Sequence, residues 1–329
     1  MPDIIFAAGM FKIWVTTFTK GMKSLRKNKE FLSKIEQIIP PARLLLDEPL
    51  ANHTTFCIGG PADYFVLPET VAEVTAVFKL AKLYAVPVTV LGNGSNVLVL
   101  DGGIRGLVLK FGGQMARLGH AGNRIVAGAG ALLCDVSRYA AEQGLSGMEF
   151  AIGIPGSIGG AVFMNAGAYE GEMSHIVNAV TAVCPDGSVK RFAKPEMEFC
   201  YRHSIFHENH CTICEVELVF RNGEQNLIRN KMGDYTAKRE IKQPLEMPSA
   251  GSTFKRPPGH FAGTLIEQTG LKGLTIGGAQ VSLKHAGFII NAGGATARDV
   301  LALIKEVQRQ VYDKHGVMLY PEVRTLGEP

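Results

Sequence analysis

Two glycine-rich segments have the composition of backbone that contacts a ligand closely. The first, Gly92-Asn93-Gly94-Ser95-Asn96, lies between two apolar runs, and its glycines allow successive N–H groups to point into one concavity suited to a phosphate. Val97 stands where a dinucleotide-binding fingerprint has its third glycine, and no helical periodicity follows, so this is not a Rossmann motif. For this segment alone, a plain glycine-rich turn is an open alternative.

The second segment combines glycine with apolar residues over a longer stretch. It runs Gly153-Ile154-Pro155-Gly156-Ser157-Ile158-Gly159-Gly160 and continues Ala161-Val162-Phe163-Met164-Asn165-Ala166-Gly167. This composition is too apolar for a flexible linker and too rich in glycine for an ordinary helix or strand. Close approach of the backbone to a flat or charged ligand explains both properties, and a tightly packed strand and turn is the alternative.

A third region gathers cysteine and histidine, which are the usual side-chain ligands of zinc. Its members are Cys200, His203, His207, His210, Cys211 and Cys214. Structural zinc takes four such ligands, often from two C-x-x-C pairs, and only Cys211 and Cys214 form such a pair here. Cys214 opens an apolar run, which favours burial as a small hydrophobe, and we predict no metal site.

A fourth group consists of polar side chains in apolar or glycine-rich surroundings towards the end of the chain. Its members are Ser252, Lys255, His285 and Glu322. A partly buried acid such as Glu322 commonly pairs with an arginine, and a serine such as Ser252 commonly caps a turn. Spacing alone does not separate these structural roles from catalytic ones.

Hydrophobic periodicity predicts the helices and strands that would position these groups. We expect a helix at 29–38 that ends before Pro40-Pro41, and a second helix opened by the capping box Thr70-x-x-Glu73. Strands are predicted at 88–91, 97–100, 107–111, 125–129, 177–183, 189–192 and 213–220, with a helix at 133–143. A charged helix at 227–243 is followed by a helix at 262–269, strands at 279–282 and 287–291, and a long helix from Thr296 to Gly316.

Length and composition indicate a globular protein of mixed α/β and α+β class. The 329 residues are 46% hydrophobic, and a net charge of +4 spread along the chain gives no footprint for nucleic acid or an anionic membrane. We predict an extension at 1–28 that is not a signal peptide, a domain at 29–221 and a domain at 222–329. No run is apolar enough to span a membrane, and the six cysteines are interpreted as reduced thiols of a cytoplasmic protein.

Several motifs, in their order along the chain, resemble the UDP-N-acetylenolpyruvoylglucosamine reductase (MurB) family over residues 45–327. Besides the glycine segments, they are Tyr201-Arg202-x-Ser204, Ala250-Gly251-Ser252-x-Phe254-Lys255, Gly277-Gly278-Ala279-Gln280-Val281-Ser282, His285-Ala286-Gly287-Phe288-Ile289-Ile290-Asn291 and Pro321-Glu322-Val323-Arg324. Only a short loop, residues 206–212, follows the Tyr-Arg motif. The chain therefore resembles the subtype that lacks the long tyrosine-bearing loop.

The resemblance implies a two-subdomain FAD-binding domain of the vanillyl-alcohol-oxidase (PCMH) type and a C-terminal α+β domain that closes over the substrate. Gly92, Asn93, Gly94, Ser95 and Asn96 would hold the FAD pyrophosphate through their backbone, and such a cradle needs no cationic side chain. The remaining FAD contacts would come from Thr54, Thr55, Gly153, Ile154, Pro155, Gly156, Ser157, Gly159, Gly160, Asn165 and Gly167.

The resemblance also implies a reaction, which is the reduction of UDP-N-acetylglucosamine enolpyruvate to UDP-N-acetylmuramate in peptidoglycan precursor synthesis. NADPH would be the hydride donor and FAD the carrier. Arg202 and Glu322 would stabilise the enolate, and Ser252 would protonate it. Glu322 is accordingly expected to be partly buried with an unfavourable charged form. Further contacts to the substrate would come from Tyr201, Lys255 and His285.

Two other functions stay open at this point. An FAD-dependent oxidase of a sugar or hydroxy acid would share the fold, and a binding module would hold a nucleotide without chemistry. The set Arg202, Ser252 and Glu322 argues against both. The sequence thus indicates a small nucleotide sugar as the partner, and it leaves protein partners open.

Overall fold

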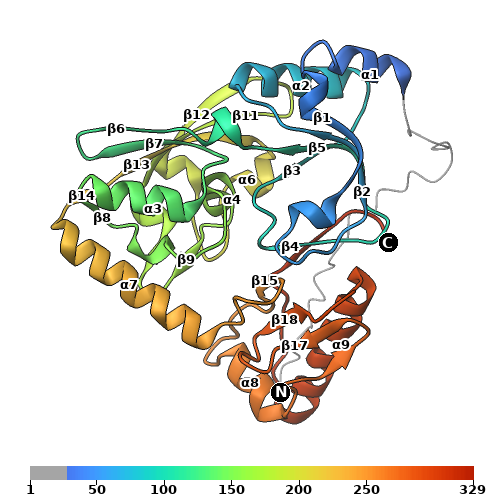
Figure 1. The fold of residues 1–329 in the computed structure, drawn as a ribbon, viewed down its shortest axis with the longest axis vertical. Helices are drawn as coiled ribbons and strands as arrows, with labels where there is room; N and C mark the ends of the chain where they lie inside the picture. The colour runs from blue at the N-terminus through green and yellow to red at the C-terminus, as the bar shows by residue number, and fades with distance from the viewer. Residues whose placement is uncertain (1–27) are drawn as a thin grey trace, which may run out of the picture.

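A computed structural model describes residues 28–329, which fold into three bodies (Figure 1). The predicted extension at 1–28 lies outside the described residues except for Asn28. The side chain of Asn28 accepts hydrogen bonds from the N–H groups of Glu30 and Phe31 and so caps α1 (Lys29–Ile35). The helix ends three residues before its predicted end at Ile38.

The first body is built on a four-stranded sheet of mixed direction, in the order β1-β2-β5-β3. Its strands are β1 (Leu44–Pro49), β2 (Pro61–Val66), β5 (Ile104–Lys110) and β3 (Val88–Leu91). Helices α1 and α2 (Val71–Leu83) cover one face of this sheet (Figure 1). Thr70 caps α2 as predicted, because its hydroxyl accepts from the N–H of Glu73. Val74, Phe78 and Ala81 then face the sheet and are buried.

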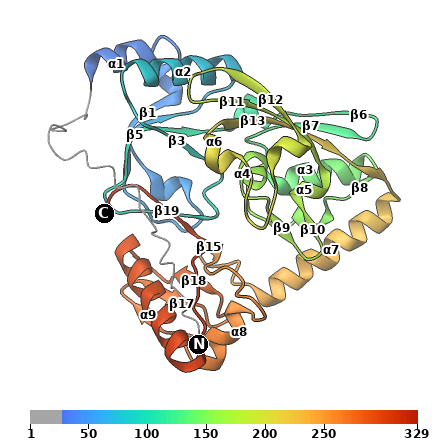
Figure 2. The same ribbon diagram turned by 180° about the vertical axis from the view of Figure 1, so that it is seen from behind.

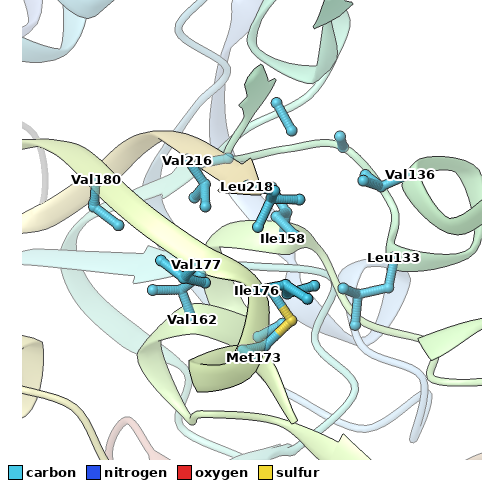
Figure 3. Close-up of a cluster of buried hydrophobic side chains, with 14 of the residues drawn as sticks. Leu133, Val136, Ile158, Val162, Met173, Ile176, Val177, Val180, Val216 and Leu218 are labelled. Carbon is cyan, nitrogen blue, oxygen red and sulfur yellow. The ribbon is translucent and has the colours of Figure 1, made fainter. Parts of the chain in front are cut away.

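The second body is an antiparallel five-stranded sheet, in the order β12-β11-β13-β7-β6. The strands are β12 (Val189–Ala193), β11 (Val177–Val183), β13 (Thr212–Val219), β7 (Arg124–Gly128) and β6 (Leu118–Ala121). Helices α3 (Leu133–Glu142) and α4 (Ile158–Phe163) pack on one face. Figure 3 shows Ile158 of α4 next to Leu218 of β13 and Val162 of α4 next to Val177 of β11, in a core with no polar side chain among the labelled residues.

Helix α4 is an element that the sequence analysis missed. The second glycine segment was judged too rich in glycine for a helix, yet Ile158–Phe163 is helical. Ser157 caps it by accepting from the N–H of Gly160, and the buried Ile158 and Val162 anchor it in the core. A side chain at Gly159 would bring its Cβ to 2.9 Å from the Cβ of Ala129, so close packing against β7 requires glycine there.

Helix α7 (Gln225–Lys242) runs along the outer edge of the second body down to the third (Figure 2). Its residues Ile228 and Met232 pack on Ala141 of α3. The third body then consists of a four-stranded antiparallel sheet and two helices, which are β15 (Ser249–Ser252), β18 (Phe288–Asn291), β17 (Ala279–Val281), β16 (Thr275–Ile276), α8 (Ala262–Thr269) and α9 (Ala297–His315). The domain boundary between 221 and 222 stays a prediction.

The third body is joined to the first through a shared core and a pair of strands. Phe56, Ile58 and Leu98 of the first body are buried in the same hydrophobic cluster as α8 and α9. In addition, β19 (Arg324–Leu326), close to the end of the chain, pairs in parallel with β4 (Val97–Val99), which directly follows the first glycine segment. The C-terminus consequently lies beside the first body in both views (Figures 1 and 2).

The interpretation of all six cysteines as reduced thiols is wrong for two of them. Cys184 and Cys211 form a disulfide. They follow and precede the paired residues Val183 and Thr212 of β11 and β13, so the register of these strands brings the two thiols face to face. Among the described residues, the other cysteines are unbridged, and Cys214 is buried within β13 as predicted.

No helix among residues 28–329 is long and apolar enough to cross a membrane. The same part of the chain contains no group of three or more His, Cys, Asp or Glu side chains that could hold a metal ion. Of the cysteine and histidine cluster, Cys211 is used in the disulfide, and His203 instead pairs with Glu208 at 2.9 Å.

Candidate functional site

The three bodies enclose one large cavity of about 1160 Å³, and residues from all three line it. The sequence-predicted residues that line it are Thr55, Gly92, Asn93, Gly94, Ser95, Asn96, Gly153, Ile154, Pro155, Gly156, Ser157, Gly159, Gly160, Gly167, Arg202, Ser252, His285 and Glu322. The fold therefore brings both glycine segments and the three predicted catalytic residues into one site. Four predicted residues are not among those lining the cavity: Thr54, Asn165, Tyr201 and Lys255.

The first glycine segment is a loop between β3 and β4 whose shape depends on glycine. Gly94 has a φ of +68°, and a Cβ there would lie 2.3 Å from the carbonyl oxygen of His53. Among the backbone hydrogen bonds of the described chain, the N–H groups of Asn93, Gly94 and Ser95 donate to no carbonyl. Three successive free donors in a turn form a concavity suited to an anion such as a phosphate.

The second glycine segment faces the first across the cavity wall. The side-chain amide of Asn93 donates to the carbonyl of Pro155 at 2.7 Å. A Cβ at Gly92 would lie 2.8 Å from the hydroxyl of Ser157, so a side chain at Gly92 would not fit between the two segments. Free N–H groups and a wall bare of side chains fit the pyrophosphate and the flat rings of FAD, which would be held by these two segments.

Two threonines and an asparagine that were predicted to contact the cofactor form hydrogen bonds with backbone carbonyl groups of the protein. Thr55 donates through Oγ1 to the carbonyl of Ser249 at 2.6 Å and so links the first body to β15. Thr54 is buried, and its hydroxyl donates to the carbonyl of Ile58. Asn165 is also buried, with its amide donating to the carbonyl of Cys200 at 3.1 Å. These contacts shape the wall, and cofactor contact by Thr54 and Asn165 stays a prediction.

Arg202 and Glu322 are joined in an ion pair across the cavity. Arg202 Nε donates to Glu322 Oε1 at 2.7 Å, and Arg202 Nη2 donates to the carbonyl of Gly167 at 3.3 Å. Arg202 has a φ of +57°, a strained conformation for a residue with a side chain. The partial burial expected of Glu322 is confirmed, since its side chain is 15% exposed. The expectation of an unfavourable charged form of Glu322 stays a prediction.

Ser252 is placed next to this pair by strand pairing. The N–H of Glu322 donates to the carbonyl of Thr253 at 2.8 Å, and the N–H of Lys255 donates to the carbonyl of Tyr320 at 2.8 Å. Ser252, the last residue of β15, is exposed towards the cavity. Its hydroxyl forms no hydrogen bond within the described chain, which leaves it free to meet a ligand.

The remaining predicted substrate residues occupy different settings. His285 lines the cavity, and burial lowers its pKa, so its ring is neutral near pH 7. Its Nδ1 accepts from the N–H of Gly287 at 3.1 Å, which leaves the proton on Nε2 as a donor. Tyr201 is exposed outside the lining, with the guanidinium of Arg202 5.0 Å from its ring centre, and Lys255 is exposed.

Two arginines that sequence reasoning missed also line the cavity. Arg324 lies 4.7 Å over the ring of Phe163, and Arg239 projects from α7 across Gly153. Burial lowers the pKa of both guanidinium groups. Arg324 belongs to the quoted Pro-Glu-Val-Arg motif and could have been chosen from it. Nothing in the charged pattern of 227–243 singles out Arg239.

Comparisons with known proteins agree with this geometry. The model of an FAD binding domain matches residues 62–193, and that of the UDP-N-acetylenolpyruvoylglucosamine reductase C-terminal domain matches residues 243–326. These matches confirm the predicted fold class.

Relatives of known function cover nearly the whole chain. A UDP-N-acetylenolpyruvoylglucosamine reductase of Clostridium perfringens is 49% identical over 91% of this chain and 98% of its own length. One of Clostridium botulinum is 47% identical over 92% of this chain and 99% of its own. The crystal structure of the reductase from Thermus caldophilus superposes with a TM-score of 0.74 at 37% identity, covering 86% of this chain and 98% of that one.

Proposed function

The chain belongs to the UDP-N-acetylenolpyruvoylglucosamine reductases, FAD-binding oxidoreductases, and from this membership we propose that it reduces the enolpyruvyl group of a UDP-sugar with NADPH. The product would be UDP-N-acetylmuramate, a precursor of peptidoglycan. A cytoplasmic location is part of the same proposal, because the reaction uses NADPH and a nucleotide sugar. One observation carries the proposal: the Arg202–Glu322 pair and the hydroxyl of Ser252 face the glycine-built wall within one cavity.

When bound, FAD would supply the hydride-transfer chemistry that links NADPH to the substrate double bond. The free N–H groups of Asn93, Gly94 and Ser95 would hold the cofactor pyrophosphate, and the second glycine segment would lie beside the rest of the cofactor.

Arg202 stabilises the negative charge that develops when hydride reaches the double bond. Its Nε and Nη2 are used by Glu322 and Gly167, and Nη1 donates no hydrogen bond within the described chain. That free edge of the guanidinium fork is suited to the carboxylate of the enolpyruvyl group. Glu322 acts through Arg202, because the ion pair fixes the direction in which the fork points.

Ser252 gives the proton that completes the reduction. A serine hydroxyl is a weak acid in water, yet the carbon of an enolate is a strong base, and the site supplies positive charge beside the hydroxyl. Arg202 and the Nε2–H of His285 line the same cavity as Ser252 and would stabilise negative charge that develops there.

The test follows flavin absorbance in an anaerobic stopped-flow experiment on wild type and Ser252→Ala. We expect NADPH to bleach both proteins at similar rates, and substrate to restore the colour of wild type. In Ser252→Ala the second phase should slow by about 10²–10⁴-fold, the usual contribution of a general acid. Ser33→Ala, on the exposed face of α1, is the matched control and should behave as wild type.

Either of two results would contradict the proposal. Equal second phases in Ser252→Ala and wild type would remove Ser252 from the proton transfer. Colour that returns with oxygen and a sugar or hydroxy acid, but not with the enolpyruvyl substrate, would make the chain an oxidase.

A further inference from the structure

Arg239 is a cation built into the wall of the cofactor cavity. It lies in the last turn of α7 and crosses the second glycine segment at Gly153. A Cβ on Gly153 would lie 2.4 Å from Cδ and 2.8 Å from Nε of Arg239, so glycine at this position allows the arginine to lie flat on the backbone. The side chain is therefore placed by packing, and it lines the cavity.

No negative charge compensates this cation within residues 28–329. Its Nε is buried without a hydrogen-bond partner, and no ion pair involves the side chain. Desolvation by burial lowers the pKa of Arg239, and the phenol of Tyr169 is the titratable group that interacts with it. Burial also raises the pKa of Tyr169, whose hydroxyl donates to the carbonyl of Tyr235, so this neighbour is neutral near pH 7.

Three other partly buried arginines of the described chain each have a carboxylate partner. Arg43 pairs with Glu73 at 2.8 Å, Arg202 pairs with Glu322 at 2.7 Å, and Arg105 pairs with Asp63. An unpaired buried charge destabilises a protein, and its persistence is explained when a ligand supplies the missing partner. Gln243, the residue that caps the C-terminal end of α7, also lines the cavity with a buried Oε1 that has no partner. Two orphaned polar atoms at this end of the helix, both on residues that line the cavity, indicate a ligand rather than a packing accident.

The position of Arg239 selects the ligand. Gly153 is two residues before Pro155, whose carbonyl is bonded to Asn93 in the loop with three free N–H groups. Arg239 therefore lies on the same wall of the cavity as the loop that is shaped to receive an anion. We propose that Arg239 is a cofactor-binding residue that neutralises the pyrophosphate of FAD, adding a cation to a cradle that the sequence predicted to be made of backbone alone.

The inference rests on the FAD site and not on the reaction proposed for it, so a binding experiment tests it independently of turnover. Full-length protein stripped of flavin is titrated with FAD and, separately, with riboflavin, which lacks the phosphates. For Arg239→Gln we expect the dissociation constant of FAD to rise about 10- to 100-fold, as for a lost charge-assisted hydrogen bond. The constant for riboflavin should stay as in wild type.

Two further variants separate charge from structure. Arg239→Lys keeps the charge without the planar fork and should recover part of the FAD affinity. Arg229→Gln, at an exposed position of the same helix, should leave both constants unchanged. Because Arg239→Gln removes an uncompensated buried charge, its flavin-free form should melt no lower than flavin-free wild type, while the rise in melting temperature on adding FAD should be smaller.

Three results would overturn the inference. One is an unchanged FAD constant in Arg239→Gln. Another is an equal loss for FAD and riboflavin, together with a lower melting temperature of the flavin-free form, which would make Arg239 a structural residue. The third is unchanged FAD binding with weakened binding of NADPH or of a UDP-sugar, which would mean that Arg239 binds a phosphate of one of those ligands instead of FAD.

Discussion

The two walls of the cavity achieve their function by opposite means. The wall made by the glycine segments offers backbone N–H groups, and it works because side chains are absent. The wall made by the end of the chain offers the side chains of Ser252 and Glu322, held by strand pairing at Thr253. We therefore expect that a side chain added to the glycine segments weakens both FAD binding and the stability of the fold. Removing a polar group of Ser252 or Glu322 should lower the rate of the reaction and leave FAD binding and stability unchanged.

The largest expected effect comes from Gly94→Ala, which adds a single methyl group to the backbone wall. The residue would have to keep a φ of +68° with its Cβ 2.3 Å from the His53 carbonyl. Left-handed strain and overpacking together should lower the free energy of unfolding by about 2–5 kcal/mol. Urea denaturation and the flavin absorbance of the purified protein measure both losses.

Gly259→Ala is the matched control for that prediction. Gly259 has a φ of +72°, but a Cβ there would meet nothing within 4 Å. It should lose only about 1–2 kcal/mol for the left-handed conformation and keep its flavin. Equal stabilities of the two variants would show that the close contact at His53 has no energetic cost. That result would contradict the statement that the glycine segments depend on the absence of side chains.

A smaller effect on the fold, but a clear one on turnover, is expected from Glu322→Gln on the other wall. The amide leaves Arg202 without its counter-charge and frees the fork to turn. We expect kcat to fall about 10²-fold, with FAD content unchanged. Steady-state kinetics and the ratio of flavin to protein absorbance provide the measurement.

Glu328→Gln offers the corresponding control outside the cavity lining. Glu328 is exposed and lies 3.8 Å from Arg105, so removing its charge should change neither kcat nor flavin content. If Glu322→Gln instead lost its flavin, the second wall would be part of the cofactor site, and the separation drawn between the two walls would not hold.

The smallest effect is expected away from both walls, at Glu73. Hydrogen bonds from Arg43 at 2.8 Å lower the pKa of this carboxyl group, and both side chains are about one-fifth exposed. A pKa that is lower in the folded state contributes stability above the unfolded value near 4.5, and this contribution disappears as the pH falls through the folded value. Glu73→Gln should therefore cost about 1–2 kcal/mol at pH 7.

Urea denaturation of wild type and Glu73→Gln at pH 7 and at pH 3 measures this linkage. The difference between the proteins should shrink towards zero at the lower pH, while kcat at pH 7 stays unchanged. A difference independent of pH would mean that the contact acts by packing and not by charge. A change in kcat would mean that the site responds to parts of the fold outside both walls.

Local patterns were sufficient to predict most elements. The helix at 262–269 and the strands at 88–91 and 177–183 begin and end where the sequence predicts. Each is bounded by residues with a strong local preference, such as the glycine after Thr269. Helix α4 was missed because glycine disfavours helix locally, and the burial that stabilises Ile158 and Val162 comes from strands distant in sequence.

Local sequence patterns could not predict the features that depend on contact between two distant segments. The Arg202–Glu322 pair joins residues 120 positions apart, and neither residue carries a local sign of the other. The disulfide of Cys184 and Cys211 needs the register of β11 and β13, which cysteine counting does not provide. The orientation of Arg239 depends on α7 packing against α3, and helical periodicity in a charged segment does not reveal it.

The pairing of β19 with β4 has a mechanical consequence for the cavity. β4 directly follows the first glycine segment, β19 begins two residues after Glu322, and the N–H of Arg324 donates to the carbonyl of Asn96 at 3.0 Å. This strand pair ties the backbone that carries Glu322 to the backbone of the glycine loop. Any motion that separates the two walls must therefore stretch a ladder of backbone hydrogen bonds, so the distance between the two walls is set by the backbone of the protein.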